Sequence, residues 1–240
     1  SMYPMLVQQG LAAVSIVGEK MHNHPGIAGK LFGTLGRNGI NVIAFAQGAK
    51  ETNISFVVPA QQLGKSMNVL HASFFLSENK VLNIFVCGVG TVGAQLIQQI
   101  DQQYDTLLKE RHLQLNIVGI ANSKTALFNP EGLDLKNYRE ELKKAETGSS
   151  FNIKHAALQM ASLYNSVFVD CTASKEVADI YLSLLDNNIS VVTANKIAAS
   201  SEYAHYMQLK QTAVERGVKF LFETNVGAGL PIIGTINDLK

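Results

Sequence analysis

The pattern of apolar and polar residues changes character near residue 79. Before that point, short apolar runs predict strands over residues 11–17, 41–46, 53–59 and 72–76. Helices are predicted over residues 27–39 and 61–71. In the first of them Ile27, Leu31 and Leu35 recur at helical spacing and lie on one face. The resulting βαββαβ order is typical of a ferredoxin-like unit of about 75 residues.

After the polar segment 77–80, strands and helices alternate. Strands are predicted over residues 81–87, 115–121, 167–171, 190–193 and 219–223. Helices are predicted between them, over residues 92–104, 137–145, 155–163, 175–187 and 201–216. Such alternation implies an α/β fold, with a doubly wound, mostly parallel sheet covered by helices on both faces. We therefore predict two domains, residues 1–79 and 80–240.

A glycine-rich turn follows the first strand of the second domain. Gly88-Val89-Gly90-Thr91-Val92-Gly93 matches the GxGxxG pattern, and it lies between a predicted strand and a predicted helix, as a dinucleotide-binding Rossmann fold requires. The first glycine permits a tight turn, the second lets the backbone approach a pyrophosphate, and the third lets the helix pack closely. Free N–H groups at the helix start then bind the phosphates. We therefore expect Gly88, Gly90, Thr91 and Gly93 to bind NAD(P).

The residues after the second strand of this domain bear on the choice of cofactor. An acidic residue there usually binds the ribose 2′-hydroxyl of NAD. Here the strand 115–121 is followed by Asn122, Ser123 and Lys124, without a carboxylate. Asn122 and Ser123 can donate hydrogen bonds, and Lys124 can pair with a phosphate. The sequence therefore favours NADP over NAD as the cofactor. If these residues bind no ligand, they form a polar turn with Lys124 in solvent.

Polar residues also follow the other predicted strands, at the edge where ligands of open α/β sheets bind. Thr172 and Ser174 can either contact a cofactor or cap the next helix. Lys196 directly follows a buried strand, where a solvated lysine is unusual, so a role in the site is favoured. In the loop 223–231, glycines on both sides of Ala228 permit dihedrals that turn carbonyl oxygens inward, or else a tight turn into a helix.

Composition and charge narrow the classes of function. The 240 residues are 47% hydrophobic and carry a net charge of +1 with scattered basic residues, which is typical of a soluble globular protein and argues against nucleic-acid binding. No apolar run approaches the ~18 residues of a membrane span. Cys87 and Cys171 lack metal-ligand spacing and are predicted to be buried, in a reducing cytoplasm. Ser1 before Met2 reads as an expression scar, and both ends suggest a piece of a longer protein.

Four motifs together resemble those of homoserine dehydrogenase. They are Asn122-Ser123-Lys124, Asp170-Cys171-Thr172, Thr193-Ala194-Asn195-Lys196 and Asn225-Val226-Gly227-Ala228-Gly229-Leu230-Pro231. The front unit resembles an ACT domain through Met21-His22-Asn23-His24-Pro25-Gly26-Ile27-Ala28-Gly29 and Ala46-Gln47-Gly48. An ACT unit immediately before homoserine dehydrogenase is the arrangement of the bifunctional aspartokinase/homoserine dehydrogenases. The resemblance covers nearly the whole chain.

The resemblance implies an NAD(P)-dependent oxidoreductase that interconverts L-homoserine and L-aspartate 4-semialdehyde. Around the cofactor it places the residues matching Val92, Asn122, Ser123, Thr172 and Lys196, and we add Ser174 and Asn195 from the same loops. A monovalent cation (sodium) is held, largely by backbone carbonyls, at the residues matching Glu223, Val226, Ala228 and Leu230.

The family's substrate-binding carboxylates and catalytic lysine lie beyond this loop, in a region that would follow Lys240. With this C-terminal catalytic region absent, we expect the chain to bind the cofactor without competent turnover. Only Lys196 is carried over, in a supporting role on the substrate side.

ACT units of the family bind an amino-acid end product, here threonine, and pair between subunits, which implies a homo-oligomer. Gln47 matches the effector contact, and its alternative is a turn residue. His22 and His24 are interpreted as loop or capping residues, since no third metal ligand is near in sequence. Two other functions remain open: a non-catalytic sensor, and another Rossmann enzyme such as an aspartate semialdehyde dehydrogenase, for which Cys171 is the only candidate nucleophile.

Overall fold

The computed structural model describes the chain in two compact units, residues 1–76 and 77–240, each with its own sheet. The described residues are 7–18, 26–48, 53–74, 79–145, 151–226, 230 and 232–238. Within these ranges no helix combines the length and the apolar character that crossing a bilayer requires.

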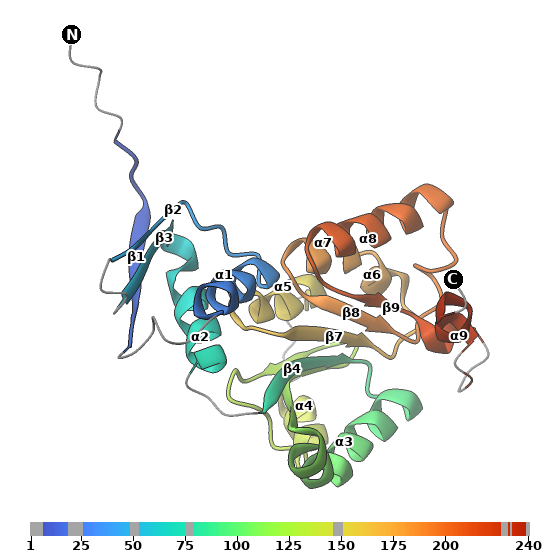
Figure 1. The fold of residues 1–240 in the computed structure, drawn as a ribbon. Coiled ribbons are helices and arrows are strands. Elements are labelled where there is room, and N and C mark those ends of the chain that lie inside the picture. Colours follow the sequence, from blue (N-terminus) through green and yellow to red (C-terminus); the bar gives the residue numbers. More distant parts are fainter. Residues whose placement is uncertain are drawn as a thin grey trace. The chain divides into compact units, whose positions relative to one another are not determined.

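The first unit has two helices on one face of a three-stranded antiparallel sheet (Figure 1). Its elements are β1 (Leu11–Val17), α1 (Ile27–Arg37), β2 (Ala44–Gln47), β3 (Asn53–Pro59), the 3-10 helix η2 (Ala60–Gln62) and α2 (Leu63–Phe74). The strand order is β1-β3-β2, and the central strand buries every second residue, as a half-covered strand should. The spans predicted for β1 and β3 are confirmed without change.

The strand predicted over residues 72–76 is wrong at its start, because residues 72–74 continue α2. Leu70 and Phe74 are separated by four residues and lie on one helical face, and Lys30 of α1 places its ammonium group 4.9 Å from the ring centre of Phe74. This contact with the neighbouring helix favours one more helical turn. Residues 75–78 lie outside the described part of the chain.

The second unit is built on a six-stranded sheet with the order β6-β5-β4-β7-β8-β9 (Figure 1). Its elements are β4 (Lys80–Cys87), α3 (Thr91–Arg111), β5 (Leu113–Ala121), β6 (Ala126–Phe128), α4 (Tyr138–Lys144), α5 (Ile153–Leu158), the 3-10 helix η3 (Gln159–Ser162), β7 (Ser166–Asp170), α6 (Lys175–Ala178), α7 (Tyr181–Asp186), β8 (Ser190–Thr193), α8 (Tyr203–Glu215), β9 (Phe220–Leu221), the 3-10 helix η4 (Glu223–Asn225) and α9 (Ile232–Asp238).

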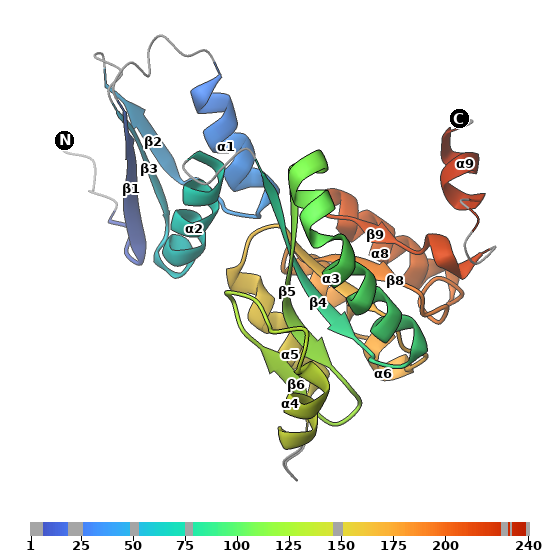
Figure 2. The ribbon, with the colours of Figure 1, turned by 90° about the horizontal axis from the view of Figure 1, so that it is seen from below.

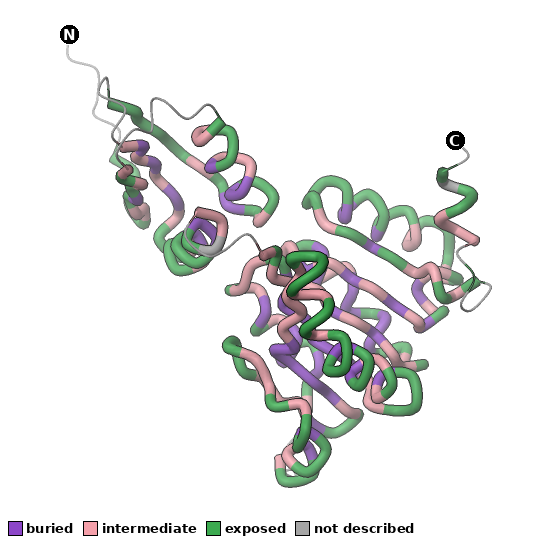
Figure 3. Tube along the Cα trace, turned by 60° about the horizontal axis from the view of Figure 1, so that its bottom comes forward, coloured by how far each residue is buried: buried purple, intermediate pink, exposed green. Residues whose placement is uncertain are grey.

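Helices cover this sheet on both faces, which confirms the doubly wound α/β prediction (Figure 2). Residues of α3 and α4 pack on one face, and residues of α5, α6, α7 and α8 pack on the other. Figure 3 shows the buried residues concentrated along the strands and the inner sides of the helices. All strand pairs are parallel except β5 with β6.

Three details of the second unit depart from the prediction. The three-residue strand β6 was not predicted, because it is too short to show an alternating pattern. The predicted helix 175–187 is divided into α6 and α7 around Asp179 and Ile180. The predicted strand 219–223 is paired only at β9, since Phe222 has left the extended conformation (φ −141°, ψ 34°) and the chain turns into η4.

A close contact between β4 and β5 at the centre of the sheet requires a glycine. Phe85 is fully buried, and its ring stacks on Phe168 of β7 with 5.6 Å between the ring centres. Gly119 pairs with Phe85 directly after a register shift, and a Cβ at Gly119 would fall inside the Phe85 ring. Only glycine therefore lets this ring lie flat against β5.

We predict that Gly119→Ala lowers the free energy of unfolding by about 1–3 kcal/mol, because the added methyl group overpacks the core at Phe85. Urea denaturation followed by circular dichroism measures the loss. Gly90→Ala is the matched control, since a Cβ there meets no atom within 4 Å. An equal loss in both variants would show that the Phe85 ring is not the cause.

Candidate functional site

The glycine-rich turn between β4 and α3 is shaped by contacts that exclude side chains. Gly88 has a φ of 94°, and a Cβ there would lie 2.8 Å from Cγ2 of Thr172. A Cβ at Gly93 would collide with the carbonyl oxygen of Gly88, so the first turn of α3 packs directly on the loop. The space beside Gly90 is open by contrast. The turn is therefore closed where it meets the protein and open where a ligand can approach.

The N-terminus of α3 is suited to an anion. Gly90 is its N-cap residue, no side chain caps it, and the first turn contains no acidic residue. Thr91 and Val92 of that turn are exposed. Uncapped N–H groups and the positive end of the helix dipole together favour a bound phosphate.

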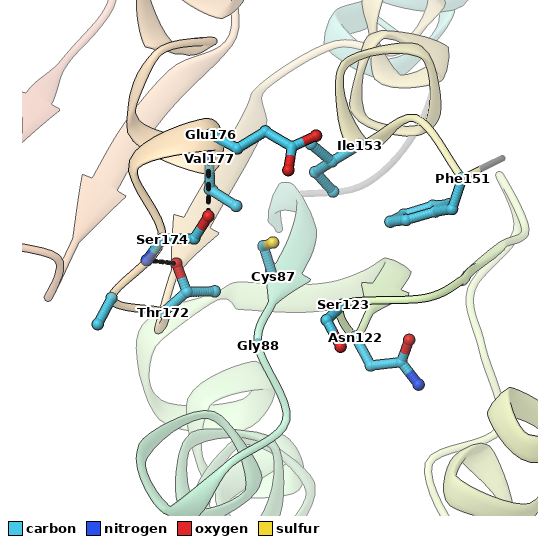
Figure 4. Close-up of a pocket in the computed structure, with 11 residues that line it drawn as sticks. Cys87, Gly88, Asn122, Ser123, Phe151, Ile153, Thr172, Ser174, Glu176 and Val177 are labelled. Carbon is cyan, nitrogen blue, oxygen red and sulfur yellow. Dashed lines mark hydrogen bonds between the residues drawn. The ribbon is translucent and has the colours of Figure 1, made fainter.

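A cavity of about 210 Å³ opens at the carboxyl ends of β4, β5 and β7 (Figure 4). The chain runs from β4 to β5 on one side and then returns to β7 on the other, so this is the switch point of the sheet, where ligands of such folds bind. The cavity is lined by Cys87, Gly88, Asn122, Ser123, Phe151, Ile153, Thr172, Ala173, Ser174, Glu176 and Val177.

The turn after β5 is organised by Asn122. Its side-chain oxygen accepts hydrogen bonds from the backbone N–H groups of Lys124 and Thr125, both at 2.8 Å. Ser123 and Lys124 are exposed, and Asn122 and Ser123 line the cavity. This turn therefore presents Ser123 and Lys124 to solvent. The geometry is compatible with both predicted alternatives: Lys124 pairing with a cofactor phosphate, and a polar turn with Lys124 in solvent.

Thr172 and Ser174 both line the cavity, and Ser174 also caps the next helix, as one of the two alternatives predicted. The hydroxyl of Thr172 accepts a hydrogen bond from the Ser174 backbone N–H at 3.1 Å. The hydroxyl of Ser174 accepts one from the Val177 backbone N–H at 3.4 Å and is the N-cap of α6. Figure 4 shows both side chains on the same wall of the cavity.

Asn195 and Lys196 follow β8, next to β7 in the sheet, but neither lines the cavity. Asn195 is buried, and its amide group binds protein atoms only. Lys196 is exposed, so its position after a buried strand does not enclose its ammonium group. The burial argument from the sequence was wrong for Lys196, because the buried residue of the loop after β8 is Asn195 and the neighbouring Lys196 is exposed.

The loop after β9 places Glu223 in a capping role. Its two carboxylate oxygens accept hydrogen bonds from the backbone N–H groups of Ile233 (2.8 Å) and Gly234 (2.9 Å) in α9. Val226 and Leu230 are exposed, and Ala228 lies outside the described residues. Among those residues, no group of three or more His, Cys, Asp or Glu side chains is placed to hold a metal ion.

The two cysteines are poor nucleophiles. Cys87 is buried at the end of β4, and burial together with the charge of Asp170 raises the pKa of its thiol far above the ordinary value. Burial and Asp170 also raise the pKa of Cys171 to about 11. Both groups are thiols at neutral pH, which argues against the aspartate semialdehyde dehydrogenase alternative.

Phe151, Ile153 and Glu176 were missed by the sequence interpretation, although all of them line the cavity (Figure 4). Ile153 is the first residue of α5 and Phe151 lies just before this helix, in the segment that connects β5 to β7. No motif marks these residues, and only the return of the chain over the sheet brings them to the site.

In the first unit, Gln47 is the last residue of β2 and pairs with Ile54 of β3. It is exposed, and residues 19–25, which carry most of the ACT-like motif including His22 and His24, lie outside the described part of the chain. The geometry therefore places Gln47 at a strand end, which fits an effector contact and a turn residue equally.

Comparison with known proteins agrees with this architecture. A model of the ACT domain matches residues 14–74, and a model of the homoserine dehydrogenase NAD-binding domain matches residues 88–223.

The chain is also similar to bifunctional aspartokinase/homoserine dehydrogenases. It is 37% identical over 236 residues to the protein from Haemophilus influenzae, covering 98% of this chain and 29% of that protein. It is 35% identical over 229 residues to the chloroplastic protein 2 from Arabidopsis thaliana, covering 94% of this chain and 25% of the relative. The chain thus spans less than a third of the length of these relatives.

Among solved structures, a hyperthermophilic archaeal homoserine dehydrogenase in complex with NADPH matches with a TM-score of 0.52 and 26% identity, covering 65% of this chain and 48% of that one. The homoserine dehydrogenase from Thermoplasma acidophilum matches with a TM-score of 0.53 and 20% identity over 66% and 48% of the two chains, and shows the shared fold. The family model of the homoserine dehydrogenase NAD-binding domain matches more than half of the residues of this chain. The chain therefore belongs to the homoserine dehydrogenase family and joins an ACT domain to that NAD-binding domain.

Proposed function

We propose that this chain is the cofactor-binding and regulatory part of a bifunctional aspartokinase/homoserine dehydrogenase. The whole protein interconverts L-homoserine and L-aspartate 4-semialdehyde in this proposal. The observation that carries it is the cavity at the carboxyl ends of β4, β5 and β7, directly beside the open glycine turn and the uncapped start of α3. A nicotinamide cofactor bound there supplies the hydride acceptor or donor of the reaction.

The residues divide into three groups around such a cofactor. Gly88, Gly90, Thr91, Val92 and Gly93 hold the pyrophosphate, because the N–H groups of the first turn of α3 face it. Asn122, Ser123 and Lys124 hold the ribose nearest the adenine. Thr172, Ser174, Asn195 and Lys196 follow β7 and β8 and lie on the nicotinamide and substrate side.

We further propose NADP as the preferred cofactor, with NAD as the weaker ligand. The turn 122–124 contains no carboxylate to bind a 2′-hydroxyl, and the Lys124 side chain is exposed beside the cavity-lining Ser123. An ammonium group at this place stabilises a 2′-phosphate by charge.

We predict that Gly90→Val abolishes NADPH binding while the chain remains folded. The valine side chain would occupy the open space beside Gly90 that a pyrophosphate needs, yet it would meet no protein atom at its Cβ. Isothermal calorimetry measures the binding, and circular dichroism checks the fold. Wild-type affinity in the variant would place the pyrophosphate elsewhere.

We predict that NADPH binds more tightly than NADH and that Lys124→Glu erases or reverses the preference, because the new carboxylate repels the 2′-phosphate. The backbone N–H of Lys124, which binds Asn122, is kept in the variant.

Lys219→Glu is the matched control for this charge reversal. Lys219 is exposed and precedes the edge strand β9, so it lies at the amino ends of the strands, whereas the cavity lies at their carboxyl ends. The control should retain the preference, and tighter binding of NADH than NADPH by the unmodified chain would contradict the cofactor assignment.

We also propose a monovalent cation, sodium, at the loop formed by Glu223, Val226, Ala228 and Leu230. A carboxylate and backbone carbonyls are the hard oxygen ligands that such a cation takes. The carboxylate oxygens of Glu223 already accept N–H groups from α9, and the carbonyl of Leu230 accepts the Ile232 N–H at 2.9 Å. A cation would share these oxygens, and its role would be to hold the loop.

For the first unit we propose that Gln47 contacts an amino-acid effector, threonine, and that ACT domains of two subunits pair in a cytoplasmic homo-oligomer. The support is the ACT family model over residues 14–74 and the exposed position of Gln47 at the end of β2. The runner-up function is a non-catalytic sensor of amino acid and nucleotide. Turnover by a longer protein containing this chain separates the two.

We predict that the 240-residue chain alone shows no homoserine-dependent reduction of NADP. Hydride transfer needs a held substrate and a group that takes the hydroxyl proton. Glu223 is engaged by α9, and Asp170 is buried and hydrogen-bonded, so neither is available as that group. Glu176 of α6 lines the same cavity that the proposed cofactor itself would fill. Absorbance at the NADPH band measures the rate.

Extension of the chain by about 150 residues from the parent protein, a typical domain length, should restore the activity. Turnover by the short chain that disappears in Lys196→Ala would instead place the catalytic groups within these 240 residues.

A further inference from the structure

A buried polar cluster lies at the carboxyl ends of β7 and β8, behind the loops of the candidate site. It consists of Asp170, Tyr181, Thr193 and Asn195, and each of these residues is at most 2% exposed. Burial of a carboxylate is costly unless hydrogen bonds compensate it. The contacts of Asp170 therefore indicate what the cluster holds together.

Three donors surround the Asp170 carboxylate. Oδ1 accepts the backbone N–H of Thr172 at 2.7 Å, and Oδ2 accepts the Tyr181 hydroxyl at 2.5 Å and the Asn195 side-chain amide at 3.0 Å. One donor thus belongs to the loop after β7, one to the loop after β8, and one to α7 beneath them. Donors on both oxygens fix the orientation of the carboxylate.

Asn195 extends this link to both loops. Its amide nitrogen also donates to the carbonyl of Ser174 at 2.9 Å, and its amide oxygen accepts the backbone N–H of Ile197 at 3.1 Å. The backbone of Lys196 is therefore held between Asn195 and Ile197. The Asn195 side-chain amide also binds Ser174, which is the N-cap residue of α6.

Tyr181 and Thr193 complete the cluster from below. The Tyr181 hydroxyl lies 2.8 Å from the Thr193 hydroxyl, which in turn accepts the backbone N–H of Asn195 at 2.9 Å. Burial and the charge of Asp170 raise the pKa of Tyr181, so its hydroxyl keeps its proton as a donor. Each side chain in the cluster thus supports another.

We infer that Asp170 is a positioning residue that couples the cofactor-side loop 171–174 to the loop 194–197 that carries Lys196. Its carboxylate is the atom group shared by the two loops, through the Thr172 N–H on one side and the Asn195 amide on the other. This inference rests on the proposed cofactor-binding function.

Stability alone does not explain a buried carboxylate, because apolar residues of similar volume often give an equally stable core. The hydrogen bonds that the Asp170 carboxylate accepts from the loops 171–174 and 194–197 instead fix the orientation of these two loops relative to each other. The link also reaches the cavity. Thr172, whose N–H binds Asp170, and Ser174, whose carbonyl accepts the Asn195 amide, both line it.

The test is an exchange of side chains between positions 170 and 195. Asp170→Asn and Asn195→Asp each juxtapose two groups of the same kind, two amides or two carboxylates, whereas the double variant restores one donor facing one acceptor at this contact. Asn195→Asp and the double variant both lack the bond to the Ser174 carbonyl, so their comparison isolates the contact between positions 170 and 195. We expect each single variant to raise the Kd for NADPH about tenfold or more, and the double variant to bind more tightly than Asn195→Asp. Because the chain contains no Trp, the emission of NADPH reports binding directly.

Asn83→Asp is the matched control, because Asn83 is another buried polar residue of the same sheet. It lies in the first half of β4, away from the cavity, and binds Asn116 (3.0 Å) and the carbonyl of Tyr164 (2.8 Å). It should lower the unfolding midpoint while the Kd of the folded chain stays that of the wild type. An equal rise of Kd in this control, or additive losses in the double variant, would overturn the inference.

Tyr181→Phe keeps the test decisive if the exchange variants fail to fold. It removes one donor from Asp170 and preserves the ring, and we expect about a threefold rise in the Kd for NADPH. An unchanged Kd in folded Tyr181→Phe would overturn the inference. Lack of NADPH binding by the wild-type chain would instead contradict the proposed function.

Discussion

The second unit depends on the left-handed turn at Gly88. A side chain there would collide with Thr172, and a side chain at Gly93 would collide with the carbonyl of Gly88. The turn can therefore reverse the chain from β4 into α3 within a few residues, and α3 begins at the carboxyl edge of the sheet. The uncapped helix start, the cavity and the loop after β7 meet at one place because of this single backbone conformation.

Charged groups at this edge are divided by their burial. Lys124 and Lys196 are exposed, whereas Asp170 is fully buried and its carboxylate accepts hydrogen bonds from the protein. Glu223 is likewise used, since both of its oxygens cap α9. A bound nucleotide would thus meet backbone N–H groups and exposed side chains of both signs, Lys124 beside the turn and Glu176 on the cavity wall, while Asp170 and Glu223 hold the loops.

The first unit places its chemistry differently. Its sheet has two exposed edge strands among the described residues, and Gln47 lies at the end of one of them. The second unit, by contrast, places the candidate site at the switch point of a sheet that helices cover on both faces. The ACT and NAD-binding family models match these separate parts of the chain. The proposed effector contact and the proposed cofactor site therefore lie on different sheets.

The sequence by itself determined the alternation of strands and helices and the phosphate turn. These follow from local rules: apolar spacing marks the buried face of each element, and the glycines of a GxGxxG pattern between a strand and a helix mark the turn between them. The spans of β1 and β3 and the two-sided covering of the larger sheet were predictable for that reason. The turn 122–124 was recognised as well, because it directly follows a predicted strand.

Only the tertiary structure decided what the polar side chains at the sheet edge do. Phe151 and Ile153 reach the cavity through the return of the chain over the sheet, and Asn195, in the loop after β8, donates to Asp170, 25 residues earlier in the chain. Residues 72–74 remain helical because Phe74 contacts Lys30 of the neighbouring helix. These outcomes depend on contacts between segments far apart in sequence, and local spacing carries no information about such contacts.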